Sequence, residues 1–219
     1  VNTCYGQCID RESKITIYTP SNIVDPIMGW WGYYLAKIGG FNYISRELGE
    51  TRPYGSFYVY DKSKNIEGGE ECLADINRLA NSDDHWVISV LAASGANEPT
   101  FPTQFHFTYG AKKGDETYDD PNITLNDIAT FEQIYQAFNS LLSEKYQFSA
   151  DKQRYHTNAS KLFFARQLEH KLNAISLRIA WSVTCWDMRA IQIAQDLAQI
   201  INQQINHCDN PIVPELKKK

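Results

Sequence analysis

The stretch covering residues 171–206 changes its hydrophobic period partway along, and this change constrains the fold more than any other feature of the sequence. Across residues 175–181 the large apolar side chains occupy every second position, as in a half-buried β-strand. Thr184 and the acid Asp187, three residues later, are then typical of the capping box that opens a helix. Apolar residues next recur at steps of three and four, which predicts an amphipathic helix of about twenty residues. They are Trp186, Ala190, Ile193, Ala194, Leu197, Ile200, Ile201 and Ile205.

The other hydrophobic patterns predict further strands and helices on both sides of this element. Strands are expected at residues 14–19, 55–61, 85–91, 105–109 and 161–168, and helices at residues 26–38, 70–79 and 124–142. The combination predicts an α+β fold with a β-sandwich-like sheet core flanked by helices.

The length of the chain bounds its domain organisation. At 219 residues it suits a single domain, residues 1–219, that can bury a full core. The aromatic helix at residues 26–38 is expected to be buried in the protein's own core, and the alternative is that an N-terminal arm and helix, over about residues 1–48, makes contacts between subunits.

Composition excludes several classes of function. The net charge is −5 and the one basic block is the run 217–219, which argues against a dedicated nucleic-acid-binding protein. No apolar run is long enough to cross a membrane, and no signal-type apolar segment follows Val1. The five cysteines (Cys4, Cys8, Cys72, Cys185, Cys208) lack the spacing of a zinc site and are interpreted as mostly reduced thiols.

One pair of residues has the chemistry of a catalytic dyad. His85 opens a predicted strand, and Cys185 stands at the start of the predicted helix, where the helix N-terminus lowers a thiol pKa. A thiol and an imidazole form a working nucleophile and base. The order of these residues resembles the cysteine peptidases that cleave ubiquitin-like proteins, but that family's Gln before the Cys and Gly after it are absent here. The alternative interpretation of Cys185 is a buried thiol under a capped helix.

Other motifs give weaker indications. The strand–helix order of residues 14–91 is compatible with a doubly wound nucleotide fold, but no Gly-rich turn follows the first strand. Glu98 in a loop after a strand could act on a glycosidic bond, although a lone Glu is usually a surface residue. Four histidines match no metal-ligand spacing, so no metal site is expected from them. They are His106, His156, His170 and His207.

Three stretches carry a resemblance to a known family. Residues 55–65 are similar to a strand followed by a Lys-Asn turn, and residues 164–179 are similar to a pair of strands. The predicted helix that contains Gln192 and Asp196 is similar to a later helix. All three counterparts are found in the cypovirus polyhedrins. The resemblance implies a non-enzymatic structural protein that assembles with itself into trimers and crystals, the occlusion bodies that embed virus particles in the host cytoplasm. It implies no required cofactor, and nucleotides held between subunits in at least part of the family.

Tyrosine usage agrees with the alkaline dissolution of such crystals. The chain has 13 Tyr, and phenols titrate near pH 10, close to Lys at about 10.4. Buried phenols at contacts would therefore be neutral at pH 7 and charged in strong alkali, where like-charge repulsion separates the subunits. The candidate alkaline-sensitive contacts are Tyr33, Tyr34, Tyr58 and Tyr60, which core packing explains equally well.

The sequence therefore leaves two hypotheses open. The first is the self-assembling occlusion-body protein, which is not an enzyme. The second is a cysteine-dependent hydrolase or peptidase that uses His85 and Cys185.

Overall fold

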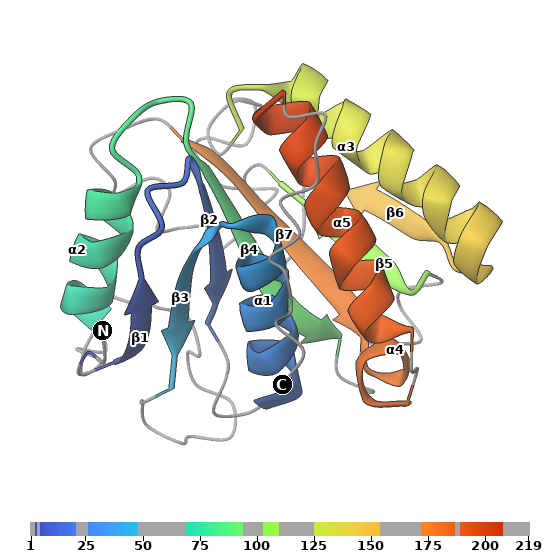
Figure 1. Cartoon of the computed structure of the whole chain (residues 1–219), viewed down its shortest axis with the longest axis horizontal. Helices are drawn as coiled ribbons and strands as arrows, with labels where there is room; N and C mark the ends of the chain where they lie inside the picture. Colours follow the sequence, from blue (N-terminus) through green and yellow to red (C-terminus); the bar gives the residue numbers. More distant parts are fainter. Residues whose placement is uncertain are drawn as a thin grey trace, which may run out of the picture.

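The computed structural model describes residues 3, 5–20, 26–47, 69–93, 103–109, 125–153, 172–186 and 189–207. Seven strands in this part of the chain form one mixed sheet in the order β1-β3-β2-β4-β7-β5-β6 (Figure 1). The strands are β1 (Gly6–Ile9), β2 (Ile15–Thr19), β3 (Asn42–Arg46), β4 (Trp86–Ala93), β5 (Phe105–Thr108), β6 (Ala150–Gln153) and β7 (Asn173–Ala180). The helices are α1 (Pro26–Gly39), α2 (Gly69–Leu79), α3 (Ile128–Leu141), the π-helical turn η3 (Leu142–Tyr146), α4 (Trp181–Trp186) and α5 (Ala190–Ile205).

The centre of the sheet is parallel. β2 pairs in parallel with β3 on one side and with β4 on the other, and β4 pairs in parallel with β7. The outer strands are less uniform, since β1 runs antiparallel to β3, and β5 runs antiparallel to β7 but parallel to β6. The four parallel strands therefore end at one edge of the sheet, called the carboxyl edge below.

One face of the sheet carries the larger hydrophobic core. Alternate residues of the strands, such as Ile17, Ile88 and Leu177, point to this face and are fully or almost fully buried under α1, α3 and α5. Figure 1 shows these three helices side by side in front of the sheet. Two buried hydrogen bonds join α1 to α5: Trp31 Nε1 donates to the carbonyl of Ala190 at 3.0 Å, and Asn202 Nδ2 to the carbonyl of Gly39 at 3.0 Å.

The opposite face of the sheet packs against α2. The side chains of Cys72 and Ile76 from this helix form a smaller buried cluster with Tyr18, Ile44 and Val87 from the strands. Helices α1 and α2 therefore cover opposite faces of the sheet.

The α+β class and the sheet core flanked by helices are confirmed. The described helices lie over both faces of the single described sheet. The strand predicted at 55–61 and that predicted at 161–168 lie outside the described residues. That residues 1–219 form one domain stays a prediction.

Several local predictions need correction. The short strands β1, β3 and β6 were not predicted, because each has only four or five residues and too few alternations to stand out. The predicted long helix is two helices, and Thr184 lies inside α4, so it does not cap the first turn. The apolar face of α5 is buried as its spacing predicted.

The N-terminal helix packs in the protein's own core, as expected, and a role of residues 1–48 in contacts between subunits stays a prediction. Trp31 and Leu35 of α1 are 1% and 0% exposed, while Trp30 is 46% exposed. Within the described ranges no helix combines the length and hydrophobicity required to span a bilayer.

Removing Leu177 tests the position of the main core. Leu177 is fully buried in a central strand, so Leu177→Ala should destabilise the protein by about 2–5 kcal/mol through lost burial and a cavity. Chemical denaturation measures this free energy of unfolding. Ile191→Ala is the control, since Ile191 is 38% exposed and its loss should change stability by less than about 0.5 kcal/mol. Equal effects of the two substitutions would contradict the assignment of the core.

Candidate functional site

The connections of β2 and β3 create a crevice at the carboxyl edge. The chain leaves β2 for α1 on one face and leaves β3 for α2 on the other, although the two strands are parallel neighbours. In open sheets with helices on both faces, ligands usually bind outside the carboxyl ends of the strands, near the point where the strand order reverses, which in the order β3-β2-β4 lies at β2. The fold therefore points to the carboxyl edge around the end of β2.

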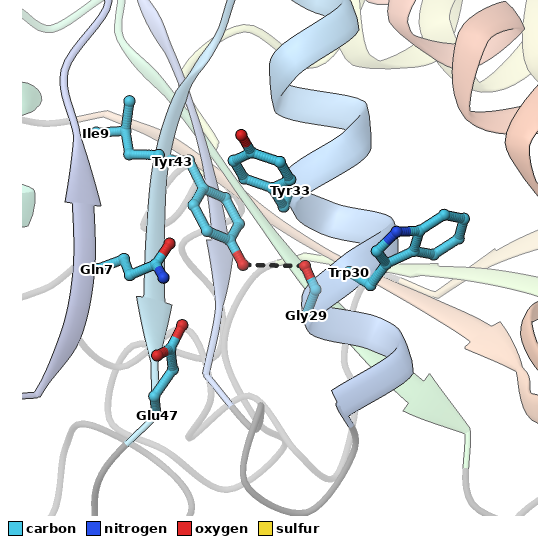
Figure 2. A pocket seen from close by; sticks show the side chains of 7 residues that line it. All are labelled: Gln7, Ile9, Gly29, Trp30, Tyr33, Tyr43 and Glu47. Atoms are coloured by element: carbon cyan, nitrogen blue, oxygen red, sulfur yellow. Dashed lines mark hydrogen bonds between the residues drawn. The ribbon is translucent and has the colours of Figure 1, made fainter. Parts of the chain in front are cut away.

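A groove of about 490 Å³ opens at this place (Figure 2). It lies between the edge strands and the beginning of α1, and it is lined by Gln7, Ile9, Gly29, Trp30, Tyr33, Tyr43 and Glu47. In Figure 2 the Tyr33 ring points toward Tyr43, whereas the Trp30 ring extends to the other side of α1. The groove thus has an aromatic wall and polar groups near the ends of β1 and β3.

Tyr43 is held in a fixed position at the centre of the groove. Its hydroxyl donates a hydrogen bond to the carbonyl of Gly29 at 3.0 Å and lies 3.0 Å from Thr19 Oγ1, so it ties β3 to both β2 and α1. The ring of Tyr33 meets that of Tyr43 edge-on, with centroids 5.5 Å apart. This arrangement gives the groove a rigid aromatic wall.

Glu47 supplies the negative charge of the groove. It follows β3 directly, its side chain is exposed, and it accepts a 2.8 Å hydrogen bond from the Ser45 hydroxyl. Its backbone N–H donates to the carbonyl of Tyr5 at 2.7 Å, which anchors the residue to the chain just before β1. An accessible and oriented carboxylate of this kind can accept a proton from water or from a bound ligand.

Gly6 allows the close approach of β1 that fixes Glu47. Its φ of 152° lies in the region that L side chains rarely adopt. A Cβ atom at this position would clash with the carbonyl oxygen of Ser45 and would lie 2.9 Å from the backbone nitrogen of Glu47.

The opposite, amino edge of the sheet has a smaller hollow of about 330 Å³. Lys14, Asp84 and Asp127 are among the residues that line it. Lys14 Nζ donates to Asp84 in an exposed ion pair at 2.5 Å, and Asp127 caps α3 by accepting from the Thr130 N–H at 2.9 Å. Each of these polar groups already has a partner within the protein, so their role is structural.

His85 is buried at this amino edge. It is 1% exposed and its Nε2 lies 2.9 Å from Thr16 Oγ1. Burial lowers the pKa of His85 to about 4, against the opposing effect of Asp84. The imidazole is therefore neutral at pH 7.

The structure does not bring His85 and Cys185 together. His85 precedes β4, whereas residue 185 lies in α4, beyond the end of β7. The two strands are parallel and paired along eight residues, from Trp86 with Asn173 to Ala93 with Ala180. At about 3.3 Å per residue the two positions are about 25 Å apart along the strands, far beyond hydrogen-bond reach.

The predicted tyrosines have separate positions. Tyr33 lies in the groove, and Tyr34 stacks on Trp30 with ring centroids 5.7 Å apart. Tyr58 and Tyr60 lie outside the described residues. A role of these tyrosines as alkaline-sensitive contacts stays a prediction.

The histidines that are described form no metal cluster. His106 is buried and its Nδ1 bonds to Asp151 across β5 and β6, while His207 follows α5. In the part of the chain that the structure describes, no three His, Cys, Asp or Glu side chains gather in a way that could hold a metal ion. His156 and His170 fall outside that part, as does Glu98.

The sequence did not indicate the groove residues. Tyr43 and Glu47 belong to a stretch with no predicted element, because the five residues Asn42–Arg46 show no clear alternation of apolar and polar side chains. Their relation to Gly6 depends on pairing across forty residues, which no local pattern reports.

Comparison with known proteins yields similarities of structure alone. No family model and no curated protein matches the chain. A bacteriophage poly-gamma-glutamate hydrolase has a TM-score of 0.51 at 11% identity, over 94% of this chain and 90% of that chain. Gene product Atu2144 from Agrobacterium tumefaciens has a TM-score of 0.51 at 8% identity, over 94% of both chains. The CwlD amidase from Clostridioides difficile, solved with the GerS lipoprotein, has a TM-score of 0.47 at 12% identity, over 90% of this chain and 100% of that chain.

These similarities overturn the resemblance to cypovirus polyhedrins. The fold is shared with a phage hydrolase, and neither the family nor the curated comparison supports a polyhedrin. The strand–helix pattern that suggested the family is a property of many sheets, and β7 is a central strand between parallel β4 and antiparallel β5.

The functional expectations drawn from that resemblance are therefore wrong. They were a non-enzymatic occlusion-body protein, trimers and crystals as its assemblies, virus particles as its partners, and the host cytoplasm as its location. Nucleotides between subunits stay a prediction that nothing here tests.

Gly6→Ala should destabilise the protein and displace Glu47. The strained φ and the clash with Ser45 predict a loss of about 1–3 kcal/mol in the free energy of unfolding. Urea denaturation provides the measurement, and Gln7→Ala, at the next position of β1, is the control. A Gly6→Ala variant as stable as the control would contradict the close approach of β1 to β3.

Stability should fall in mild acid because of His85. The pKa of His85 is about 4 in the folded state, below the ordinary value of 6.5, so the unfolded chain takes up the proton first. His85 causes no loss of stability above about pH 6.5, and as the pH falls from there to about 4 the free energy of unfolding decreases by about 3 kcal/mol. Denaturation curves of the wild type and His85→Gln across this range measure it. The free energy of unfolding of the variant should depend less steeply on pH than that of the wild type. The same dependence in both proteins would contradict a neutral buried imidazole.

Proposed function

We propose that this chain is a hydrolase that cleaves amide bonds in the groove at the carboxyl edge. The observation that carries the proposal is the position of this groove, which opens where the connections of β2 and β3 diverge and holds the accessible carboxylate of Glu47. Glu47 is the only charged residue among the seven that line the groove. Concave sites with apolar walls and few polar groups are typical of substrate binding.

The fold supports an amide as the bond that is cleaved. The bacteriophage protein with the same fold is described as a poly-gamma-glutamate hydrolase, and that polymer is linked by amides. This support is an analogy of fold, which many activities can share. The groove, which is a feature of this chain, supplies the independent support.

The proposal gives a role to three of the groove residues and to Ser45 beside them. Glu47 accepts a proton from a water molecule, whose oxygen then attacks the amide carbonyl carbon. The C–N bond breaks, the proton passes to the leaving nitrogen, and the products are a carboxylic acid and an amine. Tyr33 and Tyr43 provide the wall on which the apolar part of the substrate lies. The Ser45 hydroxyl, at 2.8 Å, holds the Glu47 carboxylate in position.

Glu47→Gln should abolish turnover while leaving the fold intact. Removing a general base costs about 10²–10⁴-fold in rate, and an exposed Gln fits the same space. The assay measures amines released from poly-γ-glutamate, with and without added Zn²⁺, because many hydrolases activate water through a metal ion. Glu144→Gln is the matched control, since Glu144 is exposed on η3, far along the chain from the groove.

Either of two results would contradict the proposal. One is the absence of amine release by the wild type from this polymer and from a panel of simpler amides. The other is a Glu47→Gln variant that turns over as fast as Glu144→Gln.

A further inference from the structure

Arg46 stands beside Glu47 in the sequence but on the other face of the sheet. It is the last residue of β3, at the same carboxyl edge. Ile44, two positions earlier, belongs to the cluster under α2, and alternation along a strand places Arg46 on that same side. The side chain of Arg46 is buried, with 4% of the residue exposed.

Among the described residues, none forms an ion pair with the Arg46 guanidinium. Its Nη1 is buried, and no hydrogen-bond acceptor for it lies in that part of the chain. Arginine keeps its charge at any pH a protein encounters. A buried charge that is left unpaired destabilises a fold, so such a residue is typical of a site that a ligand completes.

The acidic groups of α2 do not supply this partner. Glu70 and Glu71 in its first turn are exposed. Asp75 accepts from the Tyr5 hydroxyl at 2.7 Å and forms an ion pair with Arg78 at 3.1 Å.

The surroundings of Arg46 also favour an anion. Burial raises the pKa of the Cys72 thiol, and the charge of Arg46 acts in the opposite direction, so the guanidinium lies within electrostatic reach of the first turn of α2. The start of an eleven-residue helix carries partial positive charge of its own.

Two buried serine hydroxyls lie on the same face of the sheet as Arg46. Ser89 and Ser176 are directly paired across β4 and β7, and both lie on the α2 side, two residues beyond Val87 and Ala174 of the α2 cluster. They are 0% and 2% exposed, and the Oγ atom of each is buried without a hydrogen-bond partner. Donors that lack an acceptor thus lie on the same face as the unpaired guanidinium.

We propose that Arg46 binds a carboxylate of the substrate at the carboxyl edge, which makes amides of acidic residues, such as γ-glutamyl chains, the substrate class of this protein. The proposal rests on the proposed amide hydrolase. The last residue of β3 and the residue that follows it then have separate roles: Glu47 faces the scissile amide, and Arg46, on the other face of the sheet, binds a carboxylate of the same substrate molecule. The planar guanidinium matches a carboxylate with two parallel hydrogen bonds.

Calorimetric titration with γ-glutamylglutamate tests this assignment in the full-length protein. Arg46→Met should weaken binding by about 30-fold or more, since it removes a buried charge partner. Arg46→Lys keeps the charge but loses the two-pronged geometry and should bind with an intermediate affinity. Arg78→Met, at the far end of α2, is the control and should bind like the wild type. The triamide of the dipeptide, which has no carboxylate left, should bind the wild type and Arg46→Met equally.

A second measurement separates ligand binding from a structural role. Without ligand, Arg46→Met should melt at a higher temperature than the wild type, because an unpaired buried charge is gone. An arginine that stabilises the fold would give a lower melting temperature, and this result would overturn the proposal. Unchanged affinity of Arg46→Met, or tighter wild-type binding of inorganic phosphate than of the dipeptide, would also overturn it.

The outcomes distinguish this inference from the proposed function. Dipeptide binding that depends on Arg46, without any turnover, would leave the carboxylate site standing and remove the hydrolase. Turnover of poly-γ-glutamate by Arg46→Met with an unchanged KM would leave the hydrolase standing and remove the carboxylate site.

Discussion

Parallel pairing of β2 with both β3 and β4 is the constraint on which the rest of the structure depends. Because these strands share a direction, each must be followed by a crossover, and α1 and α2 provide two of them on opposite faces. The same pairing brings the ends of the strands to one edge. The site at the end of β3 is therefore a consequence of topology. The buried hydrogen bond from the Tyr43 hydroxyl to the Gly29 carbonyl holds β3 and α1 in a fixed arrangement around it.

The sequence was sufficient where a pattern was long and local. The helix α5 and the strand β7 were predicted, because each repeats its period several times. The apolar face of α5 is buried as its period requires, whereas β7 is buried on both faces and not on one. The short strand β3 was not predicted, although it carries the groove. Its five residues are all buried, so no alternation between exposed and buried positions marks them.

The candidate site depends on contacts that a local pattern cannot report. Glu47 is positioned by Gly6 and Tyr5, some forty residues earlier, and Arg46 is significant only because its buried Nη1 finds no acceptor in the described part of the chain. The predicted pair of His85 and Cys185 failed for the same reason. Its residue chemistry was suitable, but parallel pairing of β4 with β7 places the two residues at opposite edges. The phage hydrolase shares the fold of this chain, and the hydrolase class that the sequence offered as the alternative stays a proposal.

The most direct test of the account is to map where an acidic amide binds. Backbone amide resonances of the isotope-labelled protein can be followed by NMR during titration with γ-glutamylglutamate. Shifts concentrated at Gly29, Tyr43, Arg46 and Glu47, with Asp84 and Asp127 unchanged, are the predicted result. Shifts concentrated at the amino edge around Asp84 and Asp127 would contradict the claim that the carboxyl edge is the functional side of the sheet.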